Sequence, residues 1–440
     1  MQWLKINHMM VDFQPSCGKI HTMIYRKLTP KLLTALRDTP VVVLHGARQS
    51  GKSTLIQSLL TDATGQYPAH YLTLDDATVL AAADRDPTGF VNGLAELYPS
   101  LALDEVQRVP KLFLAIKALV DRDRRPGRFL LTGSANSLFV PQLAESLVGR
   151  VEILTLYPFA QAELEANQTE LIDILFAEKM SVPAFSSKES RADLLGRLLR
   201  GGYPEAVARN DEERRSAWFN SYIITILQRD VRDMANIEGL TQLPRLLQLL
   251  AARSSSLLNI AEISREVGLP STTLQRYMSL LEATFLVHLL PAWSGNLGKR
   301  LVKAPKLFLL DTGLLASQLG INLERIAGDS ILVGKVLENF VITELLKLAT
   351  WSRTRPKLFH YRTQTGQEVD CVLEDAAGRV VGIEIKSSAT VSNRDLSGLQ
   401  TLQSDSGNKF VRGINLYSGT EIIPFGSDLW ALPLSSLWQM

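Results

Sequence analysis

The stretch VVVLHGARQSGKS, residues 41–53, decides the fold of the first part of the chain. Its four apolar residues predict a buried strand, and the eight residues from Gly46 to Ser53 match the pattern G-x-x-x-x-G-K-S in full. The apolar residues of the following TLIQSLL predict a helix. A strand, a glycine-rich turn and a helix in this order are typical of a phosphate-binding loop, because the loop turns its backbone N–H groups inward at a helix N-terminus.

This motif predicts a nucleotide site. The Lys52 ammonium is expected to contact the β- and γ-phosphates, and the Ser53 hydroxyl is expected to ligate Mg²⁺. The expected cofactors are therefore ATP and Mg²⁺. The residues expected to bind the nucleotide are Gly46, Ala47, Arg48, Gln49, Ser50, Gly51, Lys52, Ser53 and Thr54.

Apolar runs at 70–75, 100–106, 128–134 and 151–156 predict four more strands, with helical stretches between them. This alternation favours a parallel sheet with helical crossovers. The run at 100–106 contains Asp104 and Glu105 near its end. In such folds the first acid acts on the metal ion and the second polarises the attacking water, so Asp104 is a predicted metal residue and Glu105 the predicted base.

Two further side chains are candidates for the same site. Ser134 ends the run at 128–134, and the carboxyl ends of parallel strands face the ligand crevice. Ser134 is expected to sense the γ-phosphate or the water, with Asn136 as the next choice; the alternative is ordinary turn chemistry. Arg150 is expected to act on the phosphate of a neighbouring subunit in a homo-oligomer, or to be a solvated arginine at a helix end.

Composition and charge limit the classes of protein to which the chain can belong. A chain of 440 residues is too long for one core, so several domains are expected, and 46% hydrophobic and 21% charged residues are ordinary for a soluble protein. A net charge of +2 gives no global attraction for nucleic acid. The two cysteines fit neither a disulfide framework nor a zinc site, which favours a reducing cytoplasm. No apolar run reaches the ~18 residues of a membrane span. Residues 1–22 lack the pattern of a signal peptide and are expected to be a poorly ordered extension.

The chain resembles the prokaryotic AAA-type ATPases that carry a C-terminal domain of unknown function. The resemblance begins at MIYRKL, includes the phosphate loop, LALDEVQ, LLTGSAN, GRVEILTLYPF and GGYPE, and continues through ILQRDV, LDTGLL and VLENFVITEL. It implies an α/β multidomain protein with a P-loop core at 23–160, a helical lid at 161–240, a winged helix at 241–322 and a restriction-endonuclease-like domain at 323–440. The resemblance implies that GGYPE lies near the lid and reaches the nucleotide; the alternative, which we prefer, is a helix stop at Gly201-Gly202.

Residues 245–310 support the winged helix independently. Apolar positions at 260, 263 and 267, a glycine at 268 and a helical stretch at about 271–283 have helix-turn-helix spacing. In a DNA reader, the side chains facing the groove would be Ser271, Thr272, Gln275 and Arg276, and those on phosphates would be Arg300, Lys303 and Lys306. The alternative is a packing module that docks protein through an exposed helix.

EVDCVLEDAAGRVVGIEIKSS, residues 368–388, predicts two strands joined by a turn. A turn at 375–379 places Asp370 opposite Glu384, where like charges repel unless a divalent cation lies between them. By resemblance, Asp370 and Glu384-x-Lys386 match the PD-(D/E)XK nuclease signature, although Val369 stands where that signature has proline. The signature implies that the acids hold Mg²⁺ or Mn²⁺ and that Lys386 orients or activates water.

Family matching adds Glu338 on the preceding helix as a third metal ligand. Glu344 has similar apolar neighbours, so composition does not choose between the two. The alternative is a nuclease-like fold whose face is inactive or only binds. Two function classes follow: an ATP-dependent enzyme that acts on DNA, or a nucleotide switch whose last domains bind a protein partner. Neither involves a membrane.

Overall fold

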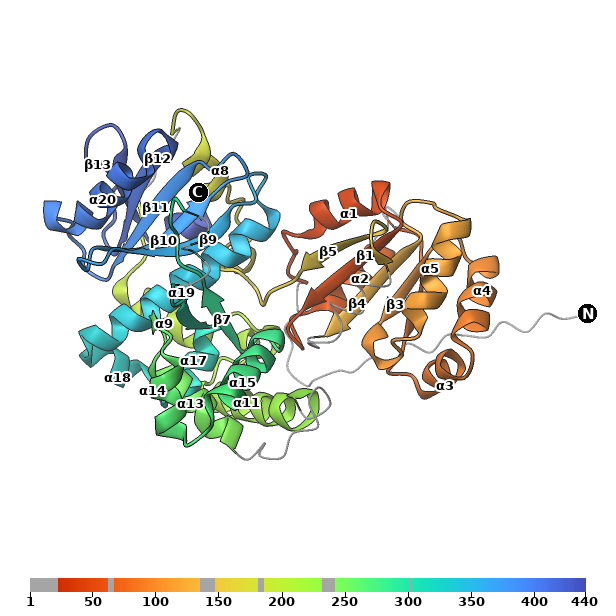
Figure 1. The fold of residues 1–440 in the computed structure, drawn as a ribbon. Coiled ribbons are helices and arrows are strands. Elements are labelled where there is room, and N and C mark those ends of the chain that lie inside the picture. The colour runs from red at the N-terminus through yellow and green to blue at the C-terminus, as the bar shows by residue number, and fades with distance from the viewer. Residues whose placement is uncertain are drawn as a thin grey trace, which may run out of the picture.

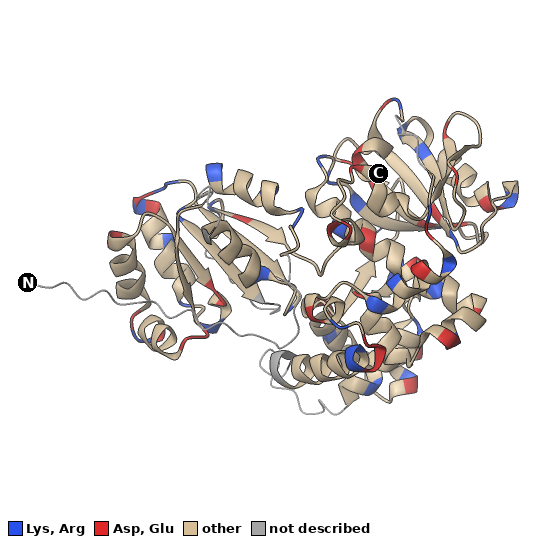
Figure 2. Ribbon diagram, turned by 180° about the vertical axis from the view of Figure 1, so that it is seen from behind, with Lys and Arg blue, Asp and Glu red and all other residues tan. Residues whose placement is uncertain are grey.

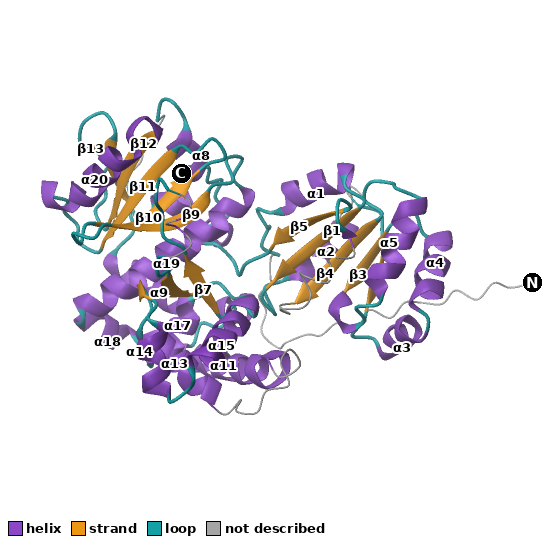
Figure 3. Cartoon of the chain, viewed as in Figure 1, coloured by secondary structure: helices purple, strands orange, loops and turns teal. Residues whose placement is uncertain are grey.

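The computed structural model describes residues 23–61, 67–134, 147–180, 186–231, 242–296, 298, 300 and 303–440. The extension at 1–22 and Asn136 lie outside these residues. Three sheets organise the chain (Figure 3). The first sheet and its helices form one body beside the other two sheets, which lie with the remaining helices (Figure 1).

The first sheet confirms the predicted parallel arrangement of five strands. Its order is β2-β3-β4-β1-β5, and every neighbouring pair is parallel. The strands are β1 Val41–Gly46, β2 His70–Thr73, β3 Leu101–Asp104, β4 Phe129–Ser134 and β5 Val151–Thr155. The helices are α1 Thr29–Asp38, α2 Lys52–Thr61, α3 Ala77–Arg85, α4 Pro87–Leu97, the 3-10 turn η1 Val106–Arg108 and α5 Leu112–Arg122.

Alternation along β1 explains why both faces of this sheet are covered. Val42 and Leu44 pack with side chains of α1 and α2, whereas Val41 and Val43 pack with side chains of α4 and α5. Residues 41–44 are all fully buried, as expected for a strand between two helical layers. This layering leaves the carboxyl end of β1 as the place where the phosphate loop emerges.

A helical segment follows the first sheet. It comprises α7 Gln161–Leu164, α8 Leu171–Phe176, α9 Arg191–Arg200, α10 Pro204–Val207, α11 Glu212–Thr225 and the π-helical turn η2 Ile226–Val231. Gly201 ends α9 with φ +71°, so the predicted helix stop is confirmed.

The next segment has a helix, a strand, two helices and two strands in that order. These are α13 Leu243–Ala252, β6 Ser256–Leu257, α14 Ile260–Val267, α15 Ser271–Ala283, β7 Val287–Leu290 and β8 Lys306–Leu309. The strands form an antiparallel sheet of order β6-β8-β7. Gly268, with φ +74°, ends α14 and turns the chain into α15.

The last segment contains the third sheet, of order β13-β14-β12-β11-β10-β9. Its strands are β9 Lys357–Arg362, β10 Glu368–Glu374, β11 Val380–Lys386, β12 Phe410–Tyr417, β13 Ile423–Pro424 and β14 Leu429–Pro433. Its helices are α17 Thr312–Leu319, α18 Leu323–Gly328, α19 Ser330–Trp351, η4 Asn393–Leu396, α20 Ser397–Ser406, η5 Gly407–Lys409 and α21 Ser436–Gln439. Glu374 pairs with Val380 and Cys371 with Ile383, so the register assumed for the hairpin is confirmed over these pairs.

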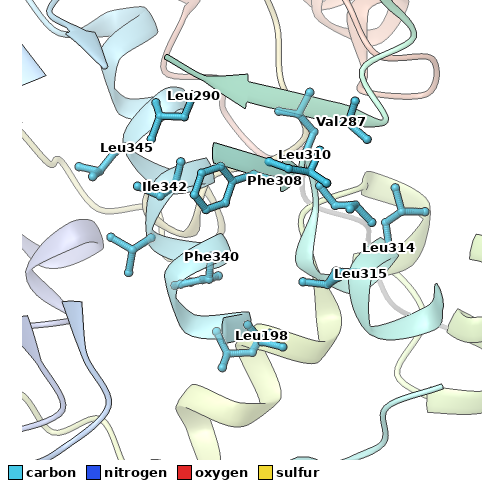
Figure 4. Close-up of a cluster of buried hydrophobic side chains, with 14 of the residues drawn as sticks. Leu198, Val287, Leu290, Phe308, Leu310, Leu314, Leu315, Phe340, Ile342 and Leu345 are labelled. Atoms are coloured by element: carbon cyan, nitrogen blue, oxygen red, sulfur yellow. The ribbon is translucent and has the colours of Figure 1, made fainter. Parts of the chain in front are cut away.

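The helical segment and the two smaller sheets share one hydrophobic core. Figure 4 shows part of this cluster, which includes Leu198 of α9, Phe308 of β8, Leu314 of α17, and Phe340 and Leu345 of α19. This cluster has members on both sides of the boundaries predicted after residues 240 and 322, which stay predictions, and we expect these segments to move together.

Charged residues are interspersed. Figure 2 shows Lys and Arg mixed with Asp and Glu over both bodies of the molecule. Within the described part of the chain, no helix is both long and apolar enough to cross a membrane.

Candidate functional site

The phosphate loop opens on a cavity of about 410 Å³ between the first sheet and the helical segment. The loop and the two neighbouring strand ends contribute Arg48, Gln49, Gly51, Lys52, Ser53, Thr54, Asp75 and Glu105. The helical segment contributes Pro204, Glu205 and Trp218. The remaining predicted nucleotide residues, Gly46, Ala47 and Ser50, are buried behind this lining.

Backbone geometry explains the glycines of the loop. A Cβ on Gly46 would lie 2.1 Å from the Leu156 carbonyl oxygen, so only glycine fits there. Gly51 has φ +95° and Gln49 has φ +58°, both in the left-handed region that lets successive N–H groups converge. The Lys52 ammonium lies 2.8 Å from the Ala47 carbonyl oxygen and 3.1 Å from that of Gly46. The positive charge is thus held across the loop, beside the cavity.

The two acids at the end of β3 have different surroundings. Asp104 is buried and does not line the cavity. Its carboxylate accepts two hydrogen bonds, from Thr132 at Oδ1 and from Tyr71 at Oδ2 over 2.8 Å. Burial raises the pKa of Tyr71, and the Asp104 charge raises it further, which keeps this hydroxyl a donor. Glu105 faces the cavity with φ +58°, an uncommon conformation for glutamate that is found at functional sites.

Hydrogen bonds to Thr132 and Gln107 also fix the position of Glu105. Its backbone N–H donates to Thr132 Oγ1 over 2.9 Å, and its carboxylate accepts from the Gln107 side chain. The predicted base therefore reaches the cavity, and the predicted metal residue lies one layer deeper. Sequence reasoning missed Tyr71, and it missed Asp75, which lines the cavity and pairs with Arg108 over 2.7 Å. Asp75 ends the predicted strand run at 70–75, so the signal was a polar residue at a strand's carboxyl end.

An aromatic group lies beside the cavity on the helical segment. The Trp218 ring stacks on Tyr222 with centroids 5.2 Å apart, and the Tyr222 hydroxyl lies 3.2 Å from the Arg48 carbonyl oxygen. Pro204 and Glu205, which line the cavity, follow the helix stop after one residue, Tyr203. GGYPE therefore ends a helix and also lines the cavity, so the two readings of this motif are compatible.

The third sheet brings the predicted nuclease residues together. Asp370 lies in β10, Glu384 and Lys386 in β11, and Glu338 in α19. The Lys386 ammonium lies 3.1 Å from Glu384 Oε1. A fifth residue, Lys306 at the start of β8, lies 3.0 Å from Glu338 Oε1 and 3.4 Å from Asp370 Oδ1.

Burial dominates the electrostatics of this acidic group. Burial raises the pKa of Glu338 and of Glu384 well above the usual range, and the Asp370 charge adds to both shifts. Burial alone would lower the pKa of Lys306, but Glu338 and Asp370 together raise it. Lys306 is therefore charged and partly neutralises the acids. Glu384 Oε2 is buried without a hydrogen-bond partner among the described residues.

This geometry does not fit the metal site predicted for Glu338, Asp370 and Glu384. Among the residues that the structure describes, no group of three or more His, Cys, Asp and Glu side chains is arranged to hold a metal ion. The Lys306 ammonium already supplies a positive charge between Glu338 and Asp370.

Family comparisons cover nearly all of the chain. A model described as an AAA domain matches residues 38–165, and two models described as domains of unknown function, DUF8612 and DUF4143, match residues 191–325 and 333–437. The uncharacterized protein Rv2008c of Mycobacterium tuberculosis is 32% identical over 415 residues, which cover 94% of this chain and 84% of that protein. The chain belongs to the family of Rv2008c.

Other comparisons are weaker. An uncharacterized protein of Haemophilus influenzae is 25% identical over 348 residues, covering 74% of this chain and 79% of that protein. Among solved structures, Cdc6p from Pyrobaculum aerophilum has a TM-score of 0.26 with 15% identity, over 71% of this chain and 93% of that chain. AMPPCP-bound DnaA from Aquifex aeolicus has a TM-score of 0.25 with 16% identity, over 58% and 86%. The AAA match and the phosphate loop identify an AAA-type P-loop ATPase domain.

Two predicted residues of the nucleotide site remain predictions in this family member. Ser134 ends β4 and pairs with Gly46 of the loop, but its side chain lies outside the described part of the chain. Arg150 pairs with Asp121 and donates to the Val148 carbonyl oxygen. It lies at the amino end of β1, where Val41 N–H donates to its carbonyl oxygen, so it cannot reach the cavity of its own chain.

The structure corrects two expected DNA contacts and chooses between two glutamates. Lys306 is buried among the acids, and Arg300 pairs with Glu374 over 2.7 Å, so neither is available to a phosphate. Glu344 accepts from the Gln161 N–H and pairs with Lys347, which assigns it to packing. Glu338 is the glutamate that lies near Asp370, because both pair with Lys306, and this agrees with the resemblance.

Proposed function

We propose that the chain binds and hydrolyses ATP in the cavity at the phosphate loop, and that the nucleotide state controls how its C-terminal segments engage DNA. The cavity is lined by Lys52 and Glu105 of the AAA domain and also by Pro204 and Trp218 of the helical segment. A phosphate bound there would touch both bodies of the molecule, so its loss on hydrolysis would change how they fit together.

The chain's own residues suggest a division of roles. Lys52 would exchange the Gly46 and Ala47 carbonyl oxygens for phosphate oxygens. Ser53 lines the cavity and would hold the Mg²⁺ that neutralises phosphate charge, with Asp104 behind it. Glu105 would orient the attacking water and draw its proton, while Thr132 fixes the Glu105 backbone.

Helix α15 is the element that we propose for DNA contact. The order of elements from α13 to β8 supports a winged helix, with α15 as its recognition helix. The four side chains predicted to face a groove, Ser271, Thr272, Gln275 and Arg276, are all exposed. Lys303 is the exposed member of the three predicted phosphate contacts.

A second candidate function is a nucleotide switch that binds a protein partner and cleaves nothing. Internal ion pairs favour this second candidate. Arg300 pairs with Glu374, and Lys306 pairs with Glu338. Of the three predicted phosphate contacts, all within the described residues, Lys303 alone is exposed, and winged helices also dock proteins.

ATP turnover and salt-titrated DNA binding test the two candidates together. The first predicts phosphate release that requires Lys52, and DNA affinity that falls steeply with salt and differs between the ATP and ADP states. ATP turnover without DNA binding in either state would favour the second candidate. Absence of ATP binding would contradict both.

A further inference from the structure

Arg26 precedes α1 and lies outside the matched AAA domain, yet it contacts the phosphate loop. Its side chain is 7% exposed. Nη1 donates to the Ser50 carbonyl oxygen over 2.7 Å, Nη2 donates to the Tyr157 carbonyl oxygen over 2.6 Å, and Nε donates to Glu163 Oε1 over 3.0 Å. The guanidinium thus joins the loop to the segment 157–163, which leads from β5 into α7.

The first of these bonds fixes a phosphate-facing peptide group. A trans peptide is planar, and its C=O and N–H point in opposite directions. Because Arg26 holds the Ser50 carbonyl, the N–H of Gly51 is turned the other way, and Gly51 lines the cavity. The Tyr222 hydroxyl beside the Arg48 carbonyl has the same effect on the N–H of Gln49. Two peptide groups of the loop are therefore oriented from outside the loop.

Helix α19 holds the middle of the segment 157–163, between the two residues that Arg26 contacts. Gln161 N–H donates to Glu344 Oε2 over 2.8 Å. The Lys347 ammonium donates to the Phe159 carbonyl oxygen over 3.0 Å and to Glu344 Oε1 over 2.7 Å. The Glu344 and Lys347 side chains are 1% and 5% exposed, so water cannot replace these bonds without movement of the backbone.

We propose that Arg26 is a positioning residue of the phosphate loop, and that through segment 157–163 it couples nucleotide affinity to the docking of α19. Glu163 links a movement of the segment to a movement of Arg26, because its carboxylate accepts from the Arg26 guanidinium. This carboxylate is 1% exposed and also accepts from the Lys27 and Ala160 N–H groups. A shift of the segment would leave a buried charge unpaired unless Arg26 moved with it, and Arg26 would then release the Ser50 carbonyl. The proposal rests on ATP binding at the proposed site.

Arg26→Lys tests the positioning role. An ammonium keeps the charge but cannot reproduce the planar fork that serves three separate acceptors. Loss of a charged hydrogen bond to the loop predicts ATP binding about tenfold weaker than wild type. Arg37→Lys is the matched control, because Arg37 is exposed at the end of α1. Fluorescent ATP analogue titrations give the affinity, and thermal melts show that each variant folds.

Two substitutions of Gln161 test the coupling at the level of one N–H group. Gln161→Pro removes the donor to Glu344, and proline is tolerated because Gln161 is the first residue of α7 and the preceding Ala160 has φ −80° and ψ 158°. Gln161→Ala removes the same side chain and keeps the donor. We expect Gln161→Pro to bind ATP several-fold more weakly than Gln161→Ala.

The outcomes separate this inference from the proposed function. If wild type binds no ATP, the proposed function fails. If wild type binds ATP and Arg26→Lys binds it equally well, the positioning role is wrong. Equal affinities for Gln161→Pro and Gln161→Ala would overturn the coupling. Should Gln161→Pro not fold, Glu344→Gln replaces it, with Glu324→Gln on the exposed face of α18 as its control.

Discussion

The Lys306 ammonium lies 3.0 Å from the Glu338 carboxylate and joins two parts of the fold that are distant in sequence. Lys306 begins β8 of the three-stranded sheet, and Glu338 lies in α19, which packs against the third sheet. The lysine side chain is 5% exposed and also reaches Asp370. Lys306 therefore supplies, from β8 and not from the hairpin, a positive charge beside Glu338 and Asp370.

Lys306→Met tests this relationship. The substitution keeps the length of the side chain and removes the charge, so the buried Asp370 and the half-buried Glu338 lose their shared partner. We expect the free energy of unfolding to fall by about 3–5 kcal/mol. Mn²⁺ should then raise the melting temperature of the variant more than that of wild type. Lys335→Met, at an exposed position of α19, is the control. Equal responses to Mn²⁺ in wild type and Lys306→Met would contradict the idea that the lysine occupies a cation position.

Lys52 and Glu105 should separate nucleotide binding from hydrolysis. Lys52→Ala is expected to abolish ATP binding, because it removes the charge that lies across the loop. Glu105→Gln should keep binding and slow phosphate release about a hundredfold or more, because only the water-polarising group is lost. Single-turnover phosphate release and a binding titration measure the two effects. A Glu105→Gln variant with wild-type turnover would show that another group activates the water.

Trp218 should report the occupant of the cavity. Its indole lines the same cavity as Lys52 and stacks on Tyr222. ATP binding is therefore expected to change the intrinsic fluorescence of the protein, and Trp218→Phe should remove most of that change while the other five tryptophans remain. Stopped-flow fluorescence with and without ATP is the measurement. An unchanged signal in Trp218→Phe would place the nucleotide away from the helical segment.

Arg276 is expected to contribute one phosphate or base contact from α15. Arg276→Ala should weaken DNA binding and lower the slope of log affinity against log salt by about one. Arg265→Ala, at an exposed position of the neighbouring α14, should leave both quantities unchanged. Fluorescence anisotropy with duplex DNA at several salt concentrations provides the data. Equal losses in the two variants would indicate a diffuse charge effect.

His360 should make the fold sensitive to acid. It is 2% exposed, and burial lowers its pKa to about 4, against about 6.5 in an unfolded chain. Between these values only the unfolded state binds the proton, so the free energy of unfolding falls as pH falls from 6.5 towards 4, by about 1.4 kcal/mol per pH unit. Gln at position 360 keeps a donor for the Ala304 carbonyl and does not titrate. Urea unfolding at pH 7, 6 and 5 should show a smaller loss in His360→Gln, and parallel losses would contradict the assignment.

Local patterns predicted much of the fold and part of each site. The five strands of the first sheet, the phosphate loop and the hairpin register follow from periodicity and turn spacing within a few residues. Glu105 was predicted because it stands near the end of an apolar strand at the right distance after a phosphate loop, and the structure places it at the cavity. The acids and Lys386 of the hairpin were placed together correctly because cross-strand neighbours are fixed by the register.

By itself, the sequence determined the P-loop core, the order of the elements and the chemical type of the residues near the nucleotide. Only the tertiary structure decided which charges are partners: Lys306 pairs with acids 32 and 64 residues away, and Arg26 pairs with Glu163, 137 residues away. The reason is physical. A backbone conformation depends on neighbours along the chain, whereas a buried charge is stable only beside an opposite charge, which packing brings from a distant segment. A basic residue in a loop therefore looks like a DNA contact until the fold shows what it is buried against.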